Sequence, residues 1–242
     1  MTPHWKGRRL GAVLWDLDGT LIDTADDIAT ALNRAFADLG LAPVPAIDVR
    51  AMIGRGAPML ISRALESQGL VVQAATREAL YQRFLIQYER MQEEGVLTAV
   101  AYPGAALALD RLAAAGVRLA CVTNKQSALA VQSLAHAGLL SRLEIVVGGD
   151  TCARRKPAPD PLQYACRSLG VPVEASLMVG DSLNDVLAAR AAPMPVICVP
   201  YGYNEGNDPR DLDADAHVES LADLPALLGM PAAATTPDSG AT

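Results

Sequence analysis

Short apolar runs that stop at polar residues recur along the chain. The first is LGAVLW at 10–15, which ends at Asp16. Continuous apolar runs of about four to eight residues are typical of strands that a parallel sheet buries on both faces. We therefore expect a first strand at 10–15, and we predict further strands at 117–122, 144–147, 176–179, 195–199 and, more weakly, 216–218.

Helical patterns separate the later strands. Two of them cover residues 104–115 and 127–137. A third is predicted to begin with Asp160 as its N-cap and a proline in its first turn. Its apolar positions are Leu162, Ala165, Cys166 and Leu169, and Gly170 ends it. Strands that alternate with helices predict an α/β fold with a right-handed, Rossmann-like parallel sheet.

The stretch between the first two strands has a different pattern, because residues 22–95 contain no convincing strand. A capping-box pattern at Thr24–Asp27 precedes a helical apolar face that continues to Leu39, and Gly40 stops it. Residues 59–67 and 75–94 also look helical. We therefore predict an α/β core domain at 1–21 and 96–230, a helical cap domain at 22–95, and a disordered tail at 231–242.

Composition limits the classes of function. The 242 residues carry 20 basic and 27 acidic side chains, a net charge of −7, which argues against a nucleic-acid partner and against an electrostatic membrane anchor. No apolar run approaches the roughly 18 residues of a membrane span. Four scattered cysteines without a CxxC pair indicate reduced thiols. Together these features predict a cytoplasmic protein with no nucleic-acid or membrane partner.

Polar residues gather where the predicted strands end. Asp16 and Asp18 follow the first strand, Thr123-Asn124-Lys125 the second, and Asp181 with Asp185 the fourth, while Lys156 lies in the loop after the third. Each has an ordinary explanation: aspartates punctuate strand ends, Ser182 and Asp185 fit a capping box, and a lysine is usually solvated. Jointly they predict a site, because the carboxyl ends of parallel strands meet at one edge of the sheet.

The charges at that edge indicate what it binds. Three carboxylates, those of Asp16, Asp18 and Asp181, repel one another unless positive charge joins them. Mg²⁺, which prefers oxygen ligands, together with Lys156 would neutralise them and leave room for an anionic phosphate. No histidine lies in these loops. The spacing of Asp16 and Asp18 suits a division of labour in which one attacks and the other moves a proton.

These motifs resemble those of the haloacid dehalogenase superfamily. DLDGT at 16–20 resembles the first motif, with Trp15 in place of the usual phenylalanine. Thr123 with its two following residues resembles the second motif, Lys156 in KPAPDP the third, and GDSLND at 180–185 the fourth. The resemblance covers residues 10–225, and the predicted helical insert is similar to the cap that this superfamily carries between its first two motifs.

The resemblance implies catalytic and metal-binding roles. Asp16 would be the nucleophile that forms an aspartyl-phosphate, and Asp18 the general acid and base. Thr123 and Lys156 would hold the phosphoryl oxygens. Mg²⁺ would be bound by the carboxylates of Asp16 and Asp181 and by the backbone carbonyl of Asp18.

Other positions would support these groups. Asp185 would be a secondary acid behind the metal or simply a helix cap, and Thr20 would orient Asp18. Thr20, Asn124 and Lys125 are further candidates for substrate binding. An acid at position 18 favours a phosphatase or a phosphomutase, because the dehalogenases proper lack it.

Three segments resemble the bacterial phosphoglycolate phosphatases: 53–65, 146–162 and 201–212. This resemblance implies 2-phosphoglycolate as the substrate of a phosphoric monoester hydrolase. It places Arg55 and Gly56 on a cap loop that faces the site, where the arginine would bind a carboxylate; a solvent-facing arginine is the alternative. Pro193 and Leu183 depart from the family pattern, and Leu183 leaves the selectivity open.

Alternatives of three kinds remain. The enzyme could hydrolyse another sugar or amino-sugar phosphate, as the N-acetylmuramic acid 6-phosphate phosphatases do, or it could be a phosphomutase. A signalling receiver domain also phosphorylates an aspartate at a parallel sheet edge, but receivers have about half this length and lack a helical insert. The partner expected in each enzymatic case is a small phosphorylated molecule, and the protein is expected to be a monomer or homodimer.

Overall fold

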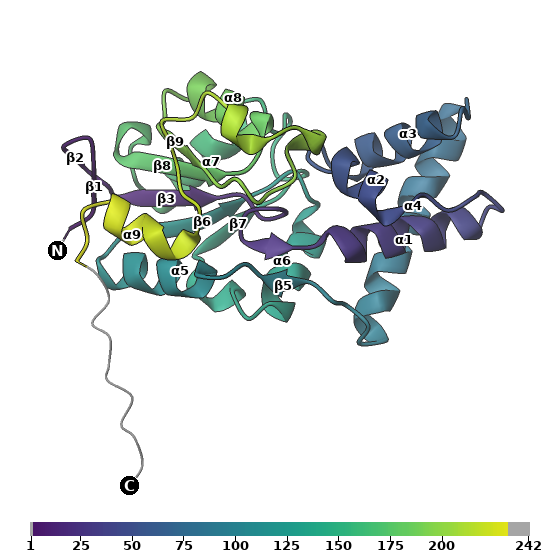
Figure 1. Ribbon diagram of the computed structural model, residues 1–242, viewed down its shortest axis with the longest axis horizontal. Helices are drawn as coiled ribbons and strands as arrows, with labels where there is room; N and C mark the ends of the chain where they lie inside the picture. Colours follow the sequence, from purple (N-terminus) through teal and green to yellow (C-terminus); the bar gives the residue numbers. More distant parts are fainter. Residues whose placement is uncertain (1, 232–242) are drawn as a thin grey trace, which may run out of the picture.

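A computed structural model describes residues 2–231 of the chain. Its central feature is a six-stranded sheet in which every neighbouring pair is parallel. The strands follow the order β10 (Ala216–His217), β9 (Val196–Cys198), β8 (Ser176–Gly180), β3 (Ala12–Trp15), β6 (Arg118–Val122) and β7 (Ile145–Val147). β3, the strand of this sheet that comes first in the sequence, therefore lies in the middle of the sheet (Figure 1).

Helices cover both faces of this sheet (Figure 1). One face packs on α5 (Ala105–Ala114), α6 (Ser127–His136) and α9 (Leu224–Leu227). The other packs on α7 (Asp160–Leu169) and α8 (Leu183–Ala191). Alternate residues of β3 serve the two layers, since Val13 and Trp15 belong to the first core and Ala12 and Leu14 to the second. Apolar side chains on both faces explain the unbroken apolar runs in the sequence.

The predicted fold class is confirmed, and all six predicted strands are present, with ends displaced by two residues or fewer. One helix start was wrong: α7 begins at Asp160 itself, and Pro159 is the N-cap residue. Short 3₁₀ turns, which the apolar pattern did not indicate, lie at Leu140–Arg142, Val173–Ala175, Asn204–Gly206, Pro209–Asp211 and Leu221–Asp223.

Four helices form a separate layer beside the carboxyl ends of the strands (Figure 1). They are α1 (Ala25–Ala37), α2 (Ala46–Met52), α3 (Ala57–Ser67) and α4 (Ala74–Glu93). We call residues 25–93 the helical insert. Its apolar faces form a core of their own around Phe36, Leu80 and Tyr88. The domain limits at 22–95 and at 1–21 with 96–230 stay a prediction.

Two features of the insert differ from expectation. The chain enters and leaves it through a short antiparallel ribbon, β4 (Ile22–Asp23) with β5 (Val100–Ala101), where no strand was predicted. The capping box at Thr24–Asp27 is also wrong, since the Thr24 side chain makes no cap hydrogen bond. Asp27 instead accepts hydrogen bonds from the backbone of Thr98 and Ala99, which ties α1 to the segment that returns to the sheet.

The two ends of the described chain lie together at the far side of the sheet from the insert (Figure 1). A small hairpin, β1 (His4–Trp5) with β2 (Arg8–Arg9), precedes the first strand of the sheet. Of the predicted tail at 231–242, all but residue 231 lies outside the described residues. Within residues 2–231, none of the helices has the length and apolarity that crossing a membrane requires.

Candidate active site

Lys156 joins two carboxylates beneath the sheet edge. Its ammonium group lies 2.8 Å from Asp16, which directly follows β3, and 2.7 Å from Asp185 in the first turn of α8. It also donates a 2.6 Å hydrogen bond to the carbonyl of Val122 at the end of β6. The lysine side chain is only 1 % exposed. Burial of this kind shows that Lys156 is a fixed cation of the site and not a solvated surface residue.

Asp181, directly after β8, is the third buried carboxylate of the site. Its two oxygens accept hydrogen bonds from the Thr20 hydroxyl at 2.8 Å and from the backbone amide of Tyr203 at 2.7 Å. A side chain at Gly202 would collide with Asp181, so glycine permits this close approach. The expectation that Thr20 orients Asp18 is therefore wrong, because its hydroxyl is used by Asp181.

Carboxylate oxygens of Asp16, Asp181 and Asp185 lie within 4.8 Å of one another. All three side chains are buried, and an all-oxygen donor set of this size suits a hard divalent cation. Asp185 already binds Lys156 through one oxygen and the Ser182 hydroxyl and amide through the other. Its capping box is present, so Asp185 both caps α8 and supports the lysine.

Burial, together with crowding of like charges, raises the pKa values of two carboxyl groups of this cluster, those of Asp16 and Asp181. Burial raises the pKa of Asp181 to about 7, with the charge of Asp185 adding to the shift against the hydrogen bonds from Tyr203 and Thr20. Burial, followed by repulsion from Asp185, also raises the pKa of Asp16 well above its usual range, although Lys156 opposes this. The ionised cluster therefore requires a positive charge to be stable.

A simple pH experiment tests this electrostatic interpretation. Folded Asp181 keeps its proton to about pH 7, whereas an ordinary aspartate loses it near 3.8, so the metal-free folded state binds more protons between these values. Its stability should then fall as pH rises through that range. We expect the metal-free Tm to be lower at about pH 8 than at about pH 5 and Mg²⁺ to raise it by a few degrees, mainly at the higher pH.

The control for this experiment is Asp181→Asn, which removes the titrating group without changing its shape. Calorimetry should show that this variant has a weaker pH dependence than the wild type, because only Asp16 of the two shifted groups still titrates, and that it loses most of the Mg²⁺ response. A metal-free Tm that rises steadily from about pH 5 to 8, with an equal Mg²⁺ effect at both ends, would contradict the interpretation.

Asp18 lies outside this cluster of three carboxylates. Its Oδ1 accepts a 2.6 Å hydrogen bond from the Thr24 hydroxyl and a 3.1 Å contact from the ammonium group of Lys125. Lys125 in turn lies 4.8 Å from the centre of the Tyr88 ring on α4 of the insert. Asp18 is thus held from the ribbon side by Thr24 and from the core side by a buried lysine.

The second-motif residues link the core to the insert. Asn124 donates hydrogen bonds to the carbonyls of Lys156 at 2.9 Å and of Gly54 at 3.0 Å. The Thr123 hydroxyl accepts from the amide of Lys125 at 3.1 Å. Gly56 has a φ of 80° and lies against the Asn124 carbonyl, where a side chain would be crowded. The loop 54–56 therefore lies directly over the edge of the sheet.

Arg55 is half exposed, and its Nε donates a 2.6 Å hydrogen bond to Glu205 of the core. Arg55, a predicted site residue, thus binds Glu205, which was not predicted to belong to the site. Thr24, Tyr203 and Glu205 are the site residues that the sequence reasoning missed. The sequence pattern predicts Thr24 to be a helix cap, and the other two residues lie within the segment 201–212 that resembles the phosphoglycolate phosphatases.

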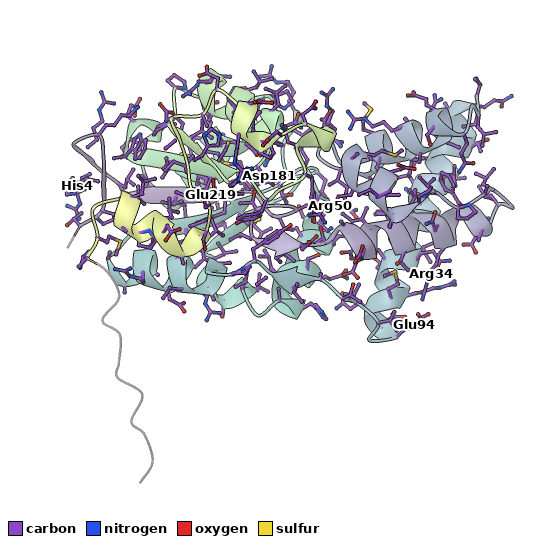
Figure 2. All side chains as sticks on the ribbon, viewed as in Figure 1. His4, Arg34, Arg50, Glu94, Asp181 and Glu219 are labelled. Carbon is purple, nitrogen blue, oxygen red and sulfur yellow. The ribbon has the colours of Figure 1, made fainter. Side chains whose placement is uncertain are left out.

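A cavity of about 410 Å³ lies elsewhere, between Trp5, Arg8, Glu174 and Pro195. These residues precede β3, β8 and β9, so the cavity is at the amino ends of the strands. Figure 2 shows the same separation, with His4 at one end of the molecule and Asp181 toward the insert. The carboxylate cluster, and not this cavity, is therefore the candidate active site.

The residues of the candidate active site lie within a segment that matches a known protein family. The family described as haloacid dehalogenase-like hydrolase matches residues 13–199, which run from β3 through β9. This chain belongs to that family. The matched segment contains Asp16, Lys156 and Asp181. The side chains that the fold brings together at one edge of the sheet therefore lie within the haloacid dehalogenase-like hydrolase match.

Curated haloacid dehalogenase-like relatives are similar over nearly the whole chain. A phosphoglycolate phosphatase of Nitrosospira multiformis is 44% identical over 90% of this chain and 95% of its own. A plasmid-encoded phosphoglycolate phosphatase of Cupriavidus necator is 48% identical over 90% of this chain and 92% of its own.

Two solved structures superpose on this chain over most of its length. A predicted phosphoglycolate phosphatase from Haemophilus somnus superposes with a TM-score of 0.81 at 29% identity, covering 89% of this chain and 96% of its own. CbbY from Rhodobacter sphaeroides in complex with phosphate superposes with a TM-score of 0.76 at 28% identity, covering 91% of this chain and all of its own.

Proposed function

We propose that this phosphoric monoester hydrolase converts 2-phosphoglycolate into glycolate and phosphate, with Mg²⁺ as its cofactor and an aspartyl-phosphate on Asp16 as its intermediate. The observation that carries the proposal is the ion pair between Asp16 and Lys156 beside two further buried carboxylates. The named relatives, 44% and 48% identical over most of the chain, support the choice of substrate.

In the first half of the proposed reaction, a carboxylate oxygen of Asp16 attacks phosphorus and the bond from phosphorus to the ester oxygen breaks. Asp18 gives its proton to the departing alkoxide, which leaves as the hydroxyl of glycolate. Lys156, fixed by the Val122 carbonyl, stabilises negative charge on the phosphoryl oxygens.

In the second half, Asp18 takes a proton from water, whose oxygen attacks the phosphorus of the aspartyl-phosphate. The acyl–phosphate bond then breaks, phosphate leaves and Asp16 is regenerated. Bound Mg²⁺ would supply positive charge for the phosphoryl group and for the cluster, and we propose as its ligands the carboxylates of Asp16 and Asp181 with the carbonyl of Asp18.

The remaining residues are proposed to bind the substrate. Thr123 and Asn124 lie at the end of β6 and would contact the phosphoryl group, as would the backbone at Thr20. Lys125 and Arg55 are the cations proposed for the carboxylate, with Gly56 giving the loop its close approach. With four carboxylates and two lysines the site carries a net charge of −2, which a divalent cation would offset.

A panel of phosphate monoesters tests this proposal. We expect the highest kcat/KM for 2-phosphoglycolate, loss of activity in EDTA and its recovery with Mg²⁺. The panel should include N-acetylmuramic acid 6-phosphate, hexose phosphates and glycolaldehyde phosphate, which lacks the carboxylate. A higher kcat/KM for one of these esters would replace the substrate, and isomerisation of a hexose phosphate without phosphate release would indicate a mutase. We further propose a cytoplasmic monomer or homodimer.

A further inference from the structure

The core turn at 203–205 contacts three parts of the site in succession. The Tyr203 amide donates to Asp181 at 2.7 Å, and the Asn204 side chain accepts from the amide of Leu183 at 3.0 Å. Glu205, the next residue, accepts hydrogen bonds from the helical insert. One short segment therefore joins the buried carboxylate cluster, the start of α8 and the insert.

Glu205 binds the insert through both of its carboxylate oxygens. Oε1 accepts from Nε of Arg55 and Oε2 from Nη2 of Arg63, each at 2.6 Å. The Glu205 side chain is 17% exposed, and the two arginines lower its pKa although burial opposes this. Paired and charge-assisted contacts of this kind are stronger than single exposed ion pairs.

The backbone of the turn is also unusual. Asn204 and Glu205 have φ values of 36° and 52°, a region that residues other than glycine rarely adopt. Such conformations persist only where the surrounding contacts hold them, and they are concentrated at functional sites. Here the contacts are the helix amide bound by Asn204 and the arginines bound by Glu205.

We call the contacts of Glu205 with Arg55 and Arg63 the clamp. The clamp determines the position of the loop 54–56. Arg55 lies in this loop, and Arg63 also donates to the carbonyl of Met52 at the end of α2, just before it. With both arginines anchored, the Gly54 carbonyl accepts from Asn124 at 3.0 Å and from Asn184 at 3.5 Å. The clamp thus fixes the insert over Asn124 and Asn184 of the core.

We propose that Glu205 is a positioning residue of the hydrolase: by binding Arg55 and Arg63 it holds the helical insert closed over the active site and sets the affinity for the ester. The proposal rests on the hydrolase site being the one at Asp16, but it is independent of which ester is the substrate.

The kinetic expectation follows from the populations of closed and open forms. When the clamp is weakened, fewer unliganded molecules have the closed, binding-competent form, so KM rises in proportion, whereas saturating substrate still closes the insert and preserves kcat. Glu205→Gln and Arg63→Met should each raise KM by about 10-fold and change kcat by less than about 2-fold. The double variant should raise KM by less than the product of the two single effects, because both variants remove the pair between Glu205 and Arg63.

Glu219→Gln is the matched control, since Glu219 pairs with Arg210 at 2.9 Å and takes no part in the contacts of Glu205 with Arg55 and Arg63. Its KM and kcat should equal those of the wild type on the best ester of the panel. Additive effects of the two clamp variants, an unchanged KM, or equal losses in kcat and kcat/KM would overturn the proposal. Should Glu205→Gln fail to fold, Arg63→Met decides alone.

Hydrogen exchange gives a readout that needs no activity. Amides of residues 54–56 should exchange faster in Glu205→Gln and Arg63→Met than in wild type and Glu219→Gln, because the loop is uncovered more often. Unchanged exchange would overturn the clamp. A different outcome separates the two proposals. If the wild type hydrolyses no ester of the panel but residues 54–56 still exchange faster in the two clamp variants, the proposed function is wrong and the clamp stands.

Discussion

Asp16→Asn should lower kcat by more than about 10⁴-fold on every phosphate ester, because an amide nitrogen or oxygen at this position cannot form the acyl-phosphate bond. The substitution keeps the shape of the side chain. It also removes one of three crowded carboxylates, and burial together with repulsion from the other two raises the pKa of Asp16. The Tm of the metal-free variant should therefore equal or exceed that of the wild type, which separates lost chemistry from lost folding.

Steady-state assays and acid-quenched reactions with ³²P-labelled substrate measure this result. The wild type should retain acid-stable label at Asp16, and the variant should retain none. Asp110→Asn is the matched control, since Asp110 forms an exposed pair with Arg142 at 2.7 Å far from the sheet edge. An Asp16→Asn enzyme with more than about 1% of wild-type activity would contradict the assignment of the nucleophile.

The sheet and the main charges of the site could be predicted because local rules determine both. Buried parallel strands need continuous apolar runs, and their carboxyl ends meet at one edge, so Asp16, Lys156 and Asp181 could be placed together without coordinates. Helix α2 and the β4–β5 ribbon were missed because a seven-residue helix and two-residue strands are too short for a periodic pattern.

The hydrogen-bond partners of Asp18 and Asp181 could not be predicted from the sequence. Two hydroxyl residues four positions apart, Thr20 and Thr24, could each have bound either aspartate. The amides of Thr20, Leu21 and Ile22 all donate to the Leu17 carbonyl, and this tight turn directs Thr20 to Asp181. Thr24, which looked like a helix cap, reaches back to Asp18 instead. A turn of this shape depends on close contact with the neighbouring strand, which sequence spacing does not encode.

The contacts of Glu205 are long-range and left no local signal. Arg63 and Arg55 lie 142 and 150 residues before it in the chain. A glutamate in a loop is ordinarily solvated, so neither its burial nor its left-handed backbone followed from composition. Arg55 was predicted to face a carboxylate, and the carboxylate that it meets in the structure belongs to the protein itself.

Asp18→Asn should lower kcat/KM for alkyl phosphates by about 10²–10⁴-fold, the usual cost of losing a general acid and base. The amide keeps an oxygen that can accept from Thr24 and Lys125, so the local hydrogen bonds can persist. The size of the loss should depend on the leaving group, because 4-nitrophenolate departs without protonation whereas an alkoxide does not. With 4-nitrophenyl phosphate the first half of the reaction should therefore be nearly normal.

Stopped-flow measurement with that ester gives the decisive pattern. Asp18→Asn should release a rapid burst of one nitrophenolate per active site and then turn over slowly, because water still lacks a base for its attack on the aspartyl-phosphate. The wild type, which has this base, serves as the reference for the slow phase. A variant that slows the burst as much as the later turnover, or that loses alkyl and aryl esters equally, would show that Asp18 acts by shaping the site and not by moving protons.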